Sequence, residues 1–285
     1  MSLDVLVTGA TGFTGRRVVA ALLHDGHRVT AFVRRTSDPE IVRGLGVPTV
    51  TGDLGAPDTL AAALTGRDAL VNVASLGFGH APGIVAAARR AGIRRSVFFG
   101  TTAVRTALDV PTKAVRLEAE RLVLSGGVGG TLLRPTMIYG APGDRNVERL
   151  IRFVRRWPVI PIPGNGQALQ QPAHVEDVAA AVAAALPRSD LAGASFDIPG
   201  PSPLTFDEMV RTVARMLGKN RSLLHVPLGL ARAFAWMVGV KREQILRIVE
   251  DKSVDVRPAG TALGYAPRAF EDGVRAEASA LGLLL

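Results

Sequence analysis

The chain has 285 residues, of which 47% are hydrophobic, and it carries a formal net charge of +9. This length and apolar content suit one α/β domain with a smaller appended region and exclude global disorder. There are no cysteines, which excludes disulfides, cysteine metal sites and thiol nucleophiles and fits a reducing, cytoplasmic location.

The excess positive charge is arginine, since lysine occurs only at positions 113, 219, 241 and 252. A nucleic-acid-binding protein usually combines clustered basic residues with aromatic side chains. Here the arginines are spread along the sequence, and aromatic residues make up only 5% of the chain. We therefore expect a solvated basic surface and no nucleic-acid partner, with part of the charge attracting an anionic cofactor or substrate.

Apolar runs and helical segments alternate through the first half of the chain. Strands are predicted at residues 4–8, 28–33, 48–51, 69–73, 96–100 and 131–134. Helices are predicted at residues 12–25, 57–64, 82–91 and 112–125. Regular alternation indicates a parallel sheet with helical crossovers, and a ligand would bind at the carboxyl ends of its strands. We predict an α/β fold, a Rossmann-type doubly wound parallel sheet, over residues 1–140.

The pattern changes after Tyr139. A basic amphipathic helix is predicted at residues 146–157, and Pro and Gly then interrupt residues 158–166. Further elements are a helix at 175–186, a strand at 195–198 and a helix at 205–217. Residues 141–285 are predicted to form mainly a smaller substrate-binding region, with residues 168–198 returning to the Rossmann domain.

The most apolar later stretch covers residues 226–240. It contains Pro227 and Arg232 and is too short to span a membrane comfortably. We expect an amphipathic helix of the substrate region, with peripheral membrane contact as the alternative. Because the N-terminus starts directly with the first strand, we expect no cleavable signal and no integral membrane segment.

A glycine-rich turn follows the first predicted strand and opens an apolar helix. The candidate cofactor contacts in this turn are Gly9, Thr11, Gly12, Phe13, Thr14 and Gly15. Glycine lets the backbone turn tightly and lets a pyrophosphate approach without a Cβ in the way. The helix that follows directs free N–H groups and its positive dipole end toward that phosphate. The turn therefore predicts a dinucleotide site; the alternative is glycine used only for packing.

This Gly-x-x-Gly-x-x-Gly spacing resembles that of the extended and atypical short-chain dehydrogenase/reductase superfamily, which includes epimerase/dehydratase-like and NmrA-like proteins. Similar segments follow at residues 52–54, 71–75, 133–140 and 172–179. The resemblance implies a bound NAD(P), with Asp53 at the adenine edge. The cofactor contacts that it implies beyond the glycine turn are Asp53, Leu54, Ala74, Ser75, Pro135 and Thr136.

The end of the second predicted strand distinguishes the two nicotinamide cofactors. NAD-specific sites usually place an acidic residue about 20 residues beyond the glycine motif, on the ribose hydroxyls. Here that position holds Arg34 and Arg35, and no acidic residue occurs before Asp38. The two arginines suit a 2′-phosphate, so we predict NADP(H) in preference to NAD(H). Alternatively, both are only solvated turn residues. Arg16 could also reach the phosphate.

Superfamily members that transfer hydride use a Ser or Thr after the fifth strand and a Tyr-x-x-x-Lys pair on the next helix. The lysine lowers the pKa of the tyrosine, which acts as acid or base. Thr102 matches the hydroxyl residue, but the tyrosine has no match. One register places Thr112 and Arg116 in the two positions, and another places Asp109 and Lys113 there. We favour the first register, because its distance to the Arg-Pro segment needs no gap.

Other residues are then candidates for the missing chemistry. Tyr139 is the candidate proton donor, with a packed wall residue as the alternative. Arg116 is a candidate clamp for ribose or substrate, because a guanidinium does not deprotonate. Phe78, His80 and His174 are candidates for lining the substrate pocket. No spacing of His, Asp and Glu suggests a metal site.

These features predict an NADP(H)-dependent oxidoreductase that reduces a carbonyl or an activated double bond of a small organic substrate. In the superfamily that the chain resembles, some reductases lack the Tyr-Lys pair and depend on the bound cofactor and on substrate positioning. One alternative is a sugar-nucleotide epimerase or dehydratase, although that chemistry needs the missing tyrosine. The other is a non-catalytic NADP(H)-binding sensor or structural subunit. The oligomeric state stays open.

Overall fold

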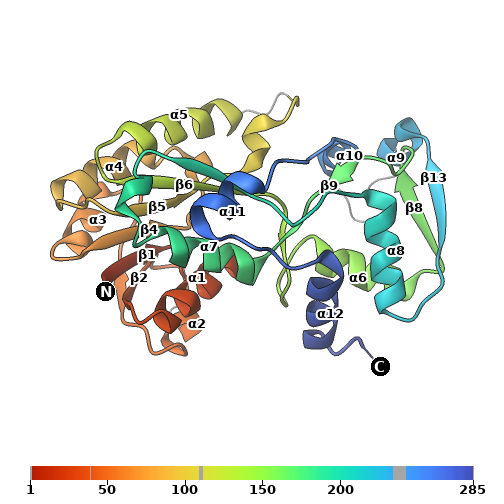
Figure 1. Cartoon of the computed structure of the whole chain (residues 1–285), viewed down its shortest axis with the longest axis horizontal. Coiled ribbons are helices and arrows are strands. Elements are labelled where there is room, and N and C mark those ends of the chain that lie inside the picture. The colour runs from red at the N-terminus through yellow and green to blue at the C-terminus, as the bar shows by residue number, and fades with distance from the viewer. Residues whose placement is uncertain (1, 39, 109–111, 234–241, 285) are drawn as a thin grey trace. The chain divides into compact units, whose positions relative to one another are not determined.

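The computed structural model describes all residues except 1, 39, 109–111, 234–241 and 285, and the chain divides into two compact units (Figure 1). Unit 1 consists of Met1–Pro135, Glu176–Ile198 and Arg257–Tyr265. Unit 2 consists of Thr136–Val175, Pro199–Val256 and Ala266–Leu285. Residues 168–175, which we expected in the Rossmann part, thus lie in unit 2, and residues 257–265 return to unit 1.

Unit 1 is built on a seven-stranded parallel sheet, which confirms the predicted Rossmann-type fold. In spatial order the strands are β11 (Ser195–Ile198), β6 (Gly130–Pro135), β5 (Ser96–Phe99), β4 (Ala69–Asn72), β1 (Asp4–Thr8), β2 (Arg28–Val33) and β3 (Thr49–Thr51). Val5 pairs with Val29 on one side and with Ala69 on the other. The order reverses between β1 and β4, and doubly wound sheets bind ligands at such a point.

Helices cover both faces of this sheet, so its strands are buried on both sides and read as continuous apolar runs. In Figure 1, α4 and α5 lie above the sheet, and α1 and α7 lie below it. The helices are α1 (Phe13–His24), α2 (Glu40–Arg43), α3 (Pro57–Leu64), α4 (Ala81–Arg90), α5 (Thr112–Ser125), α7 (Val175–Ala185) and α11 (Arg257–Leu263). Short 3-10 turns occur at η1 (Leu76–Phe78), η2 (Thr102–Arg105) and η3 (Ser189–Leu191). Leu60, Ile84 and Phe98 belong to one buried cluster of this unit.

Unit 2 combines helices with three two-stranded sheets. The strand pairs are β7 (Ile138–Tyr139) with β10 (Ala173–His174), β9 (Leu169–Gln170) with β12 (Leu204–Thr205), and β8 (Val159–Pro163) with β13 (Ser222–Val226). The helices are α6 (Val147–Arg156), α8 (Phe206–Met216), α9 (Leu228–Ala233), α10 (Arg242–Ile248) and α12 (Phe270–Ala280). Ile151, Ile160, Val210 and Val274 form part of its core.

Within residues 226–240, where we expected an amphipathic helix, the described part contains the end of β13 at Val226 and the helix α9 over Leu228–Ala233. Pro227 separates the strand from this helix. Residues 234–240 lie outside the described part. Among the described residues, no helix combines the length and the apolar character that crossing a membrane requires.

Candidate functional site

The glycine turn lies between β1 and α1, where the predicted phosphate site should be. Gly9 adopts a φ of 70°, and the amide of Gly12 donates to the carbonyl of Gly9 at 3.0 Å. A Cβ on Gly15 would lie 2.0 Å from that carbonyl oxygen, so only glycine fits there. Gly12 precedes α1 and caps it without a side-chain hydrogen bond, and the first turn holds no acidic residue. The N–H groups in the first turn of α1 are therefore available to an anion.

Two buried polar residues connect the ends of β1 and β4. The hydroxyl of Thr8 donates to Oδ1 of Asn72 at 2.7 Å, and Nδ2 of Asn72 donates to the carbonyl of Ala74 at 2.9 Å. A Cβ on Gly9 would lie 2.8 Å from the amide nitrogen of Ala74, so this peptide packs closely against the glycine turn. The sequence analysis did not assign Thr8 and Asn72 a role. In the sequence, each of these polar residues ends an apolar strand. Because a buried polar side chain needs a hydrogen-bond partner, this pattern could have indicated that the two residues pair.

Three arginines are candidates for binding the predicted 2′-phosphate. Arg34 and Arg35 are exposed and lie in the turn after β2, which the amide of Ser37 closes by donating to the carbonyl of Arg34 at 2.9 Å. Arg16, in the first turn of α1, has a buried Nε without a hydrogen-bond partner in the part of the chain that the structure describes. A buried donor of this kind is costly unless a ligand or water satisfies it. The donor set thus fits an anionic cofactor.

The Asp53 turn lies after β3. Oδ1 of Asp53 accepts from the amide of Gly55 at 2.8 Å, and its amide donates to Oγ1 of Thr59 at 3.1 Å. A Cβ on Gly55 would lie 3.7 Å from Cε1 of His80. The structure therefore places His80, which we expected in the substrate pocket, beside the turn that carries Asp53. This position favours the adenine end of a dinucleotide.

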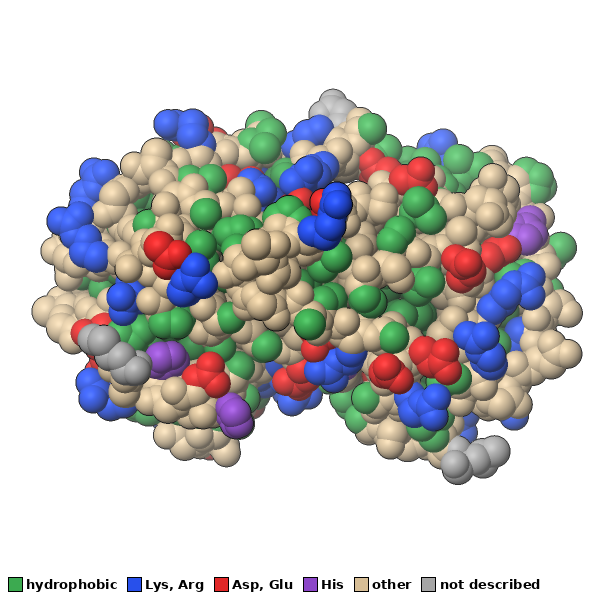
Figure 2. All heavy atoms as spheres, viewed as in Figure 1, with side chains coloured by type: hydrophobic (Ala, Val, Ile, Leu, Met, Phe, Trp, Pro, Cys, Tyr) green, Lys and Arg blue, Asp and Glu red, His purple; other side chains and the backbone are tan. Residues whose placement is uncertain are grey.

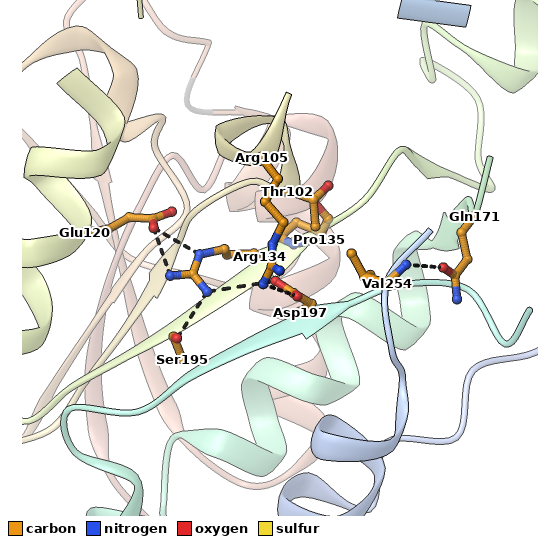
Figure 3. A network of polar contacts seen from close by, with 9 residues as sticks. All are labelled: Thr102, Arg105, Glu120, Arg134, Pro135, Gln171, Ser195, Asp197 and Val254. Carbon is orange, nitrogen blue, oxygen red and sulfur yellow. Dashed lines mark hydrogen bonds and ion pairs between the residues drawn. The ribbon is translucent and has the colours of Figure 1, made fainter. Parts of the chain in front are cut away.

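Thr102 begins η2, directly after β5 and Gly100-Thr101. Its hydroxyl donates to the carbonyl of Pro135, the last residue of β6, at 3.4 Å (Figure 3). The preceding residue, Thr101, accepts a hydrogen bond from the amide of Ala103 at 3.2 Å and caps the short helix. The hydroxyl of Thr102 is thus held at the carboxyl ends of β5 and β6.

Arg116 lies against η1. A Cβ on Gly77 would be 2.9 Å from Nε of Arg116 and 3.4 Å from the hydroxyl of Ser75, so these side chains meet at one position. Lys113 points elsewhere, because its Nζ donates to the carbonyl of Thr106 at 2.6 Å. The geometry supports the register that places Arg116 in the lysine position. Asp109, which belongs to the other register, lies outside the described residues.

A polar network joins η2, α5, β6 and β11 (Figure 3). Nε of Arg134 donates to Oε2 of Glu120 at 3.0 Å, and Arg134 also donates to the hydroxyl of Ser195 at 3.1 Å. Asp197 forms an ion pair with Arg105 at 2.5 Å. This network ties the segment that begins with Thr102 to the edge strand of the sheet.

The three remaining candidates belong to unit 2 and are packed there. Tyr139 is only 1% exposed, and its hydroxyl donates to the carbonyl of Phe270 at 3.4 Å. His174 is buried, with its ring 5.4 Å from that of Tyr139 in an edge-on arrangement. The hydroxyl of Thr136 donates to the carbonyl of Gln171. Burial of the phenol argues against the expectation that Tyr139 serves as proton donor and favours the alternative of a wall residue.

Two further candidates, Phe78 and Leu54, belong to unit 1. Phe78, at the end of η1, is 76% exposed, and its ring lies 6.4 Å from that of His80. Leu54 is half-buried against the core of unit 1. Among the described residues, no three His, Asp or Glu side chains are grouped in a way that could hold a metal ion.

The sheet order and the glycine turn at the end of β1 define an NAD(P)-binding protein of the Rossmann type. The profile of the NAD(P)H-binding family matches residues 9–188, so the chain belongs to this family. It is an atypical short-chain dehydrogenase/reductase, as its motifs predicted.

Curated relatives agree with this assignment, and solved structures agree with the fold. The ceramide reductase of Caulobacter vibrioides is 32% identical over 235 residues, which cover 78% of this chain and 73% of that protein. The 2-alkyl-3-oxoalkanoate reductase of Stenotrophomonas maltophilia is 25% identical over 96% of this chain and 98% of its own length. A nucleoside-diphosphate-sugar epimerase of Pseudomonas aeruginosa superimposes with a TM-score of 0.81 over 99% of this chain and 98% of its own. At 16% identity, that likeness shows the fold alone.

Proposed function

We propose that this protein is an NADPH-dependent reductase that acts on the carbonyl group of a small, largely apolar substrate. The observation that carries the proposal is the glycine turn from Gly9 to Gly15, which opens α1 without an acidic residue in its first turn. Arg16 in that first turn has a buried Nε without a partner among the described residues, and Arg34 and Arg35 after β2 are exposed. Guanidinium groups suit a 2′-phosphate better than ribose hydroxyls.

The cofactor would supply the hydride, and this chain would bind and orient it. In the proposed arrangement, the N–H groups of the first turn of α1 bind the pyrophosphate, and Asp53 with His80 borders the adenine. Ala74 and Ser75 lie beside the nicotinamide ribose, where Arg116 acts as a clamp. Pro135 forms part of the wall at the end of β6.

The hydroxyl of Thr102 is proposed to orient the substrate carbonyl. Arg116 would stabilise the negative charge that develops on the carbonyl oxygen, since a positioned cation favours that charge in the transition state. A guanidinium does not give up its proton, and the phenol of Tyr139 is packed inside unit 2. We therefore assign protonation of the product oxygen to solvent.

Two observations support an apolar substrate. The names of two relatives state that they reduce a ceramide and a 2-alkyl-3-oxoalkanoate, both of which contain alkyl groups. In this chain, Phe78 is exposed next to Gly77, the residue that Arg116 lies against. An exposed aromatic ring beside the proposed clamp suits an alkyl chain, because burying that ring removes apolar surface from water.

A non-catalytic NADPH-binding role is the second candidate, and the observation that favours it is Thr112 in the position of the family's tyrosine. The missing tyrosine also disfavours an epimerase or dehydratase, because these enzymes need it for reversible alcohol oxidation. Titration of NADPH by calorimetry and its oxidation with β-keto acids and keto-lipids separate the two candidates. Binding with turnover supports the reductase, binding without turnover supports the second candidate, and no binding rejects both.

A further inference from the structure

Two segments of unit 2 carry a local excess of positive charge. Residues 145–163 and 219–233 contain eight Lys and Arg side chains against one Glu, whereas the whole chain has 34 Lys and Arg against 25 Asp and Glu. These residues include α6, β8, β13 and α9. In Figure 2, several Lys and Arg side chains lie at the right of the view, where Figure 1 draws β8 and β13.

The outward face of β8 and β13 is largely apolar, with Ser222 opposite Val159 as a polar member. Along β8, Ile160 and Ile162 point into the core of unit 2, so Val159 and Pro161 point outward. Pro161 pairs with Leu224 of β13 in the parallel register, which places Leu224 on the same outward face. Val159 is 46% exposed and Leu224 55%. Aliphatic side chains at this exposure on adjacent strands form an unusual surface for a region so rich in charge.

An exposed tryptophan and arginines border this face. Trp157 lies two residues before Val159 and is 49% exposed, and the guanidinium of Arg156 lies 5.7 Å from its ring. Arg221 donates to the carbonyl of Val154 at 2.7 Å and to that of Arg155 at 3.0 Å, which brings the start of β13 to the end of α6. On α9, two residues beyond β13, Leu230 is 53% exposed, and Arg232 is exposed as well.

We propose that this surface, formed by Trp157, Val159, Leu224 and the surrounding arginines, binds the surface of an anionic lipid bilayer. Tryptophan and aliphatic side chains enter the boundary between headgroups and acyl chains, and Lys and Arg attract anionic headgroups. A symmetric dimer would place the same patch against itself, and the repulsion between its arginines and those of the second copy would oppose it. A nucleic acid would use the arginines but would leave the aliphatic strand face without a partner.

The test is co-sedimentation of the purified full chain with vesicles. Vesicles that contain phosphatidylglycerol should bind the protein, pure phosphatidylcholine vesicles should bind it much more weakly, and added salt should release it. Replacing Arg155 and Arg156 by Ser should weaken binding by roughly 5-fold per arginine, from about 1 kcal/mol for each charge. Val159→Ser with Leu224→Ser should also weaken it, while NADPH affinity and the circular dichroism spectrum stay unchanged.

Matched controls come from exposed residues of unit 1. Ile41→Ser removes an apolar side chain that is 38% exposed, and Arg43→Ser removes a surface arginine, so neither should change vesicle binding. Equal binding to both kinds of vesicle, binding to neither, or insensitivity to the unit 2 changes overturns the proposal. So does binding to a DNA duplex that depends on Arg155 and Arg156 but not on Leu224. A dimer in sedimentation velocity that Leu224→Ser dissociates would instead identify a second copy as the partner.

Discussion

Arg134 and Glu120 form an ion pair in the interior of unit 1, where Nε lies 3.0 Å and a second guanidinium nitrogen 2.9 Å from the same carboxylate oxygen. Removing one partner of such a pair leaves a buried charge without compensation. Glu120→Gln should therefore reduce the free energy of unfolding by about 3–5 kcal/mol in urea denaturation. The control is Glu118→Gln on the same helix, whose exposed pair with Arg121 should contribute nothing measurable. Equal stability of the two variants would show that the Arg134 pair is unimportant.

The cofactor preference depends on the turn after β2. If Arg34 and Arg35 bind a 2′-phosphate, each change to Ala should weaken NADPH binding by about tenfold to a hundredfold, equivalent to about 1.5–3 kcal/mol. NADH lacks this phosphate, so its affinity is the internal control and should change little. Calorimetric titration of both cofactors measures the effect. Equal affinities of the parent protein for NADPH and NADH would reject the assignment.

Two glycines of the same turn should behave differently. A Cβ on Gly12 meets only the carbonyl of Gly9, at 3.2 Å, whereas a Cβ on Gly15 meets it at 2.0 Å. Gly12→Val should therefore fold, with its side chain blocking the pyrophosphate and abolishing NADPH binding. Gly15→Ala should lower the melting temperature, because helix and turn must move apart. Unchanged NADPH affinity in folded Gly12→Val would place the phosphate elsewhere.

Tyr139→Phe tests the role of the buried phenol. The hydroxyl bonds the carbonyl of Phe270, so its loss should cost about 0.5–1.5 kcal/mol of stability and leave turnover unchanged. Thr102→Val should instead lower turnover by up to about a hundredfold without changing NADPH affinity, since the hydroxyl is assigned to substrate orientation. Steady-state kinetics with a substrate found in the carbonyl panel measures both. A large loss of turnover in Tyr139→Phe would restore the phenol as the acid.

Stability should depend on pH through Glu277 on α12. Burial, together with the neighbouring Asp144 and Glu148, raises the pKa of this carboxyl from 4.5 to about 8. Between these two values the folded chain keeps a proton that the unfolded chain has lost. The free energy of unfolding should thus fall by about 1.4 kcal/mol per pH unit over this range, a contribution fully present only below pH 4.5.

Glu277→Gln removes the titrating group and should flatten that pH profile. Glu271→Gln, at a half-exposed position of the same helix, is the matched control and should leave the profile as it is. Urea denaturation at several pH values compares the three proteins. A Glu277→Gln profile as steep as that of the parent protein would assign the dependence to other groups.

The sequence predicted unit 1 well, because each buried strand is a local apolar run and each glycine turn a local motif. It did not predict the small sheets of unit 2. Four of these strands are only two residues long and are too short to show an alternating apolar pattern: β7, β9, β10 and β12. The prolines at 161 and 163 made the sequence of β8 typical of a loop. The pairing of β8 with β13 joins residues about sixty positions apart, such as Pro161 and Leu224. Local patterns carry no information on such pairing.

The site residues also divide into those that local sequence could predict and those that it could not. Gly9, Gly12 and Gly15 could be assigned from spacing, since their role depends on neighbours in the chain. The burial of Tyr139 and the position of His80 beside Gly55 depend on distant segments of the chain, so position along the sequence could not predict either. The sequence analysis did not identify Thr8 and Asn72, because neither residue type indicates a function by itself. Their hydrogen bond forms only when β1 and β4 pair.

The edge strand of unit 1, β11, comes after the first segment of unit 2, Thr136–Val175, in the chain. On the ribosome, β6 therefore emerges about sixty residues before β11, the strand that pairs with it. Until then its outer edge presents unpaired N–H and C=O groups, which other chains can bind. A protein cut at residue 140 would keep that edge permanently open. We expect such a fragment to aggregate, so the glycine turn and its sheet cannot be transplanted as a contiguous piece.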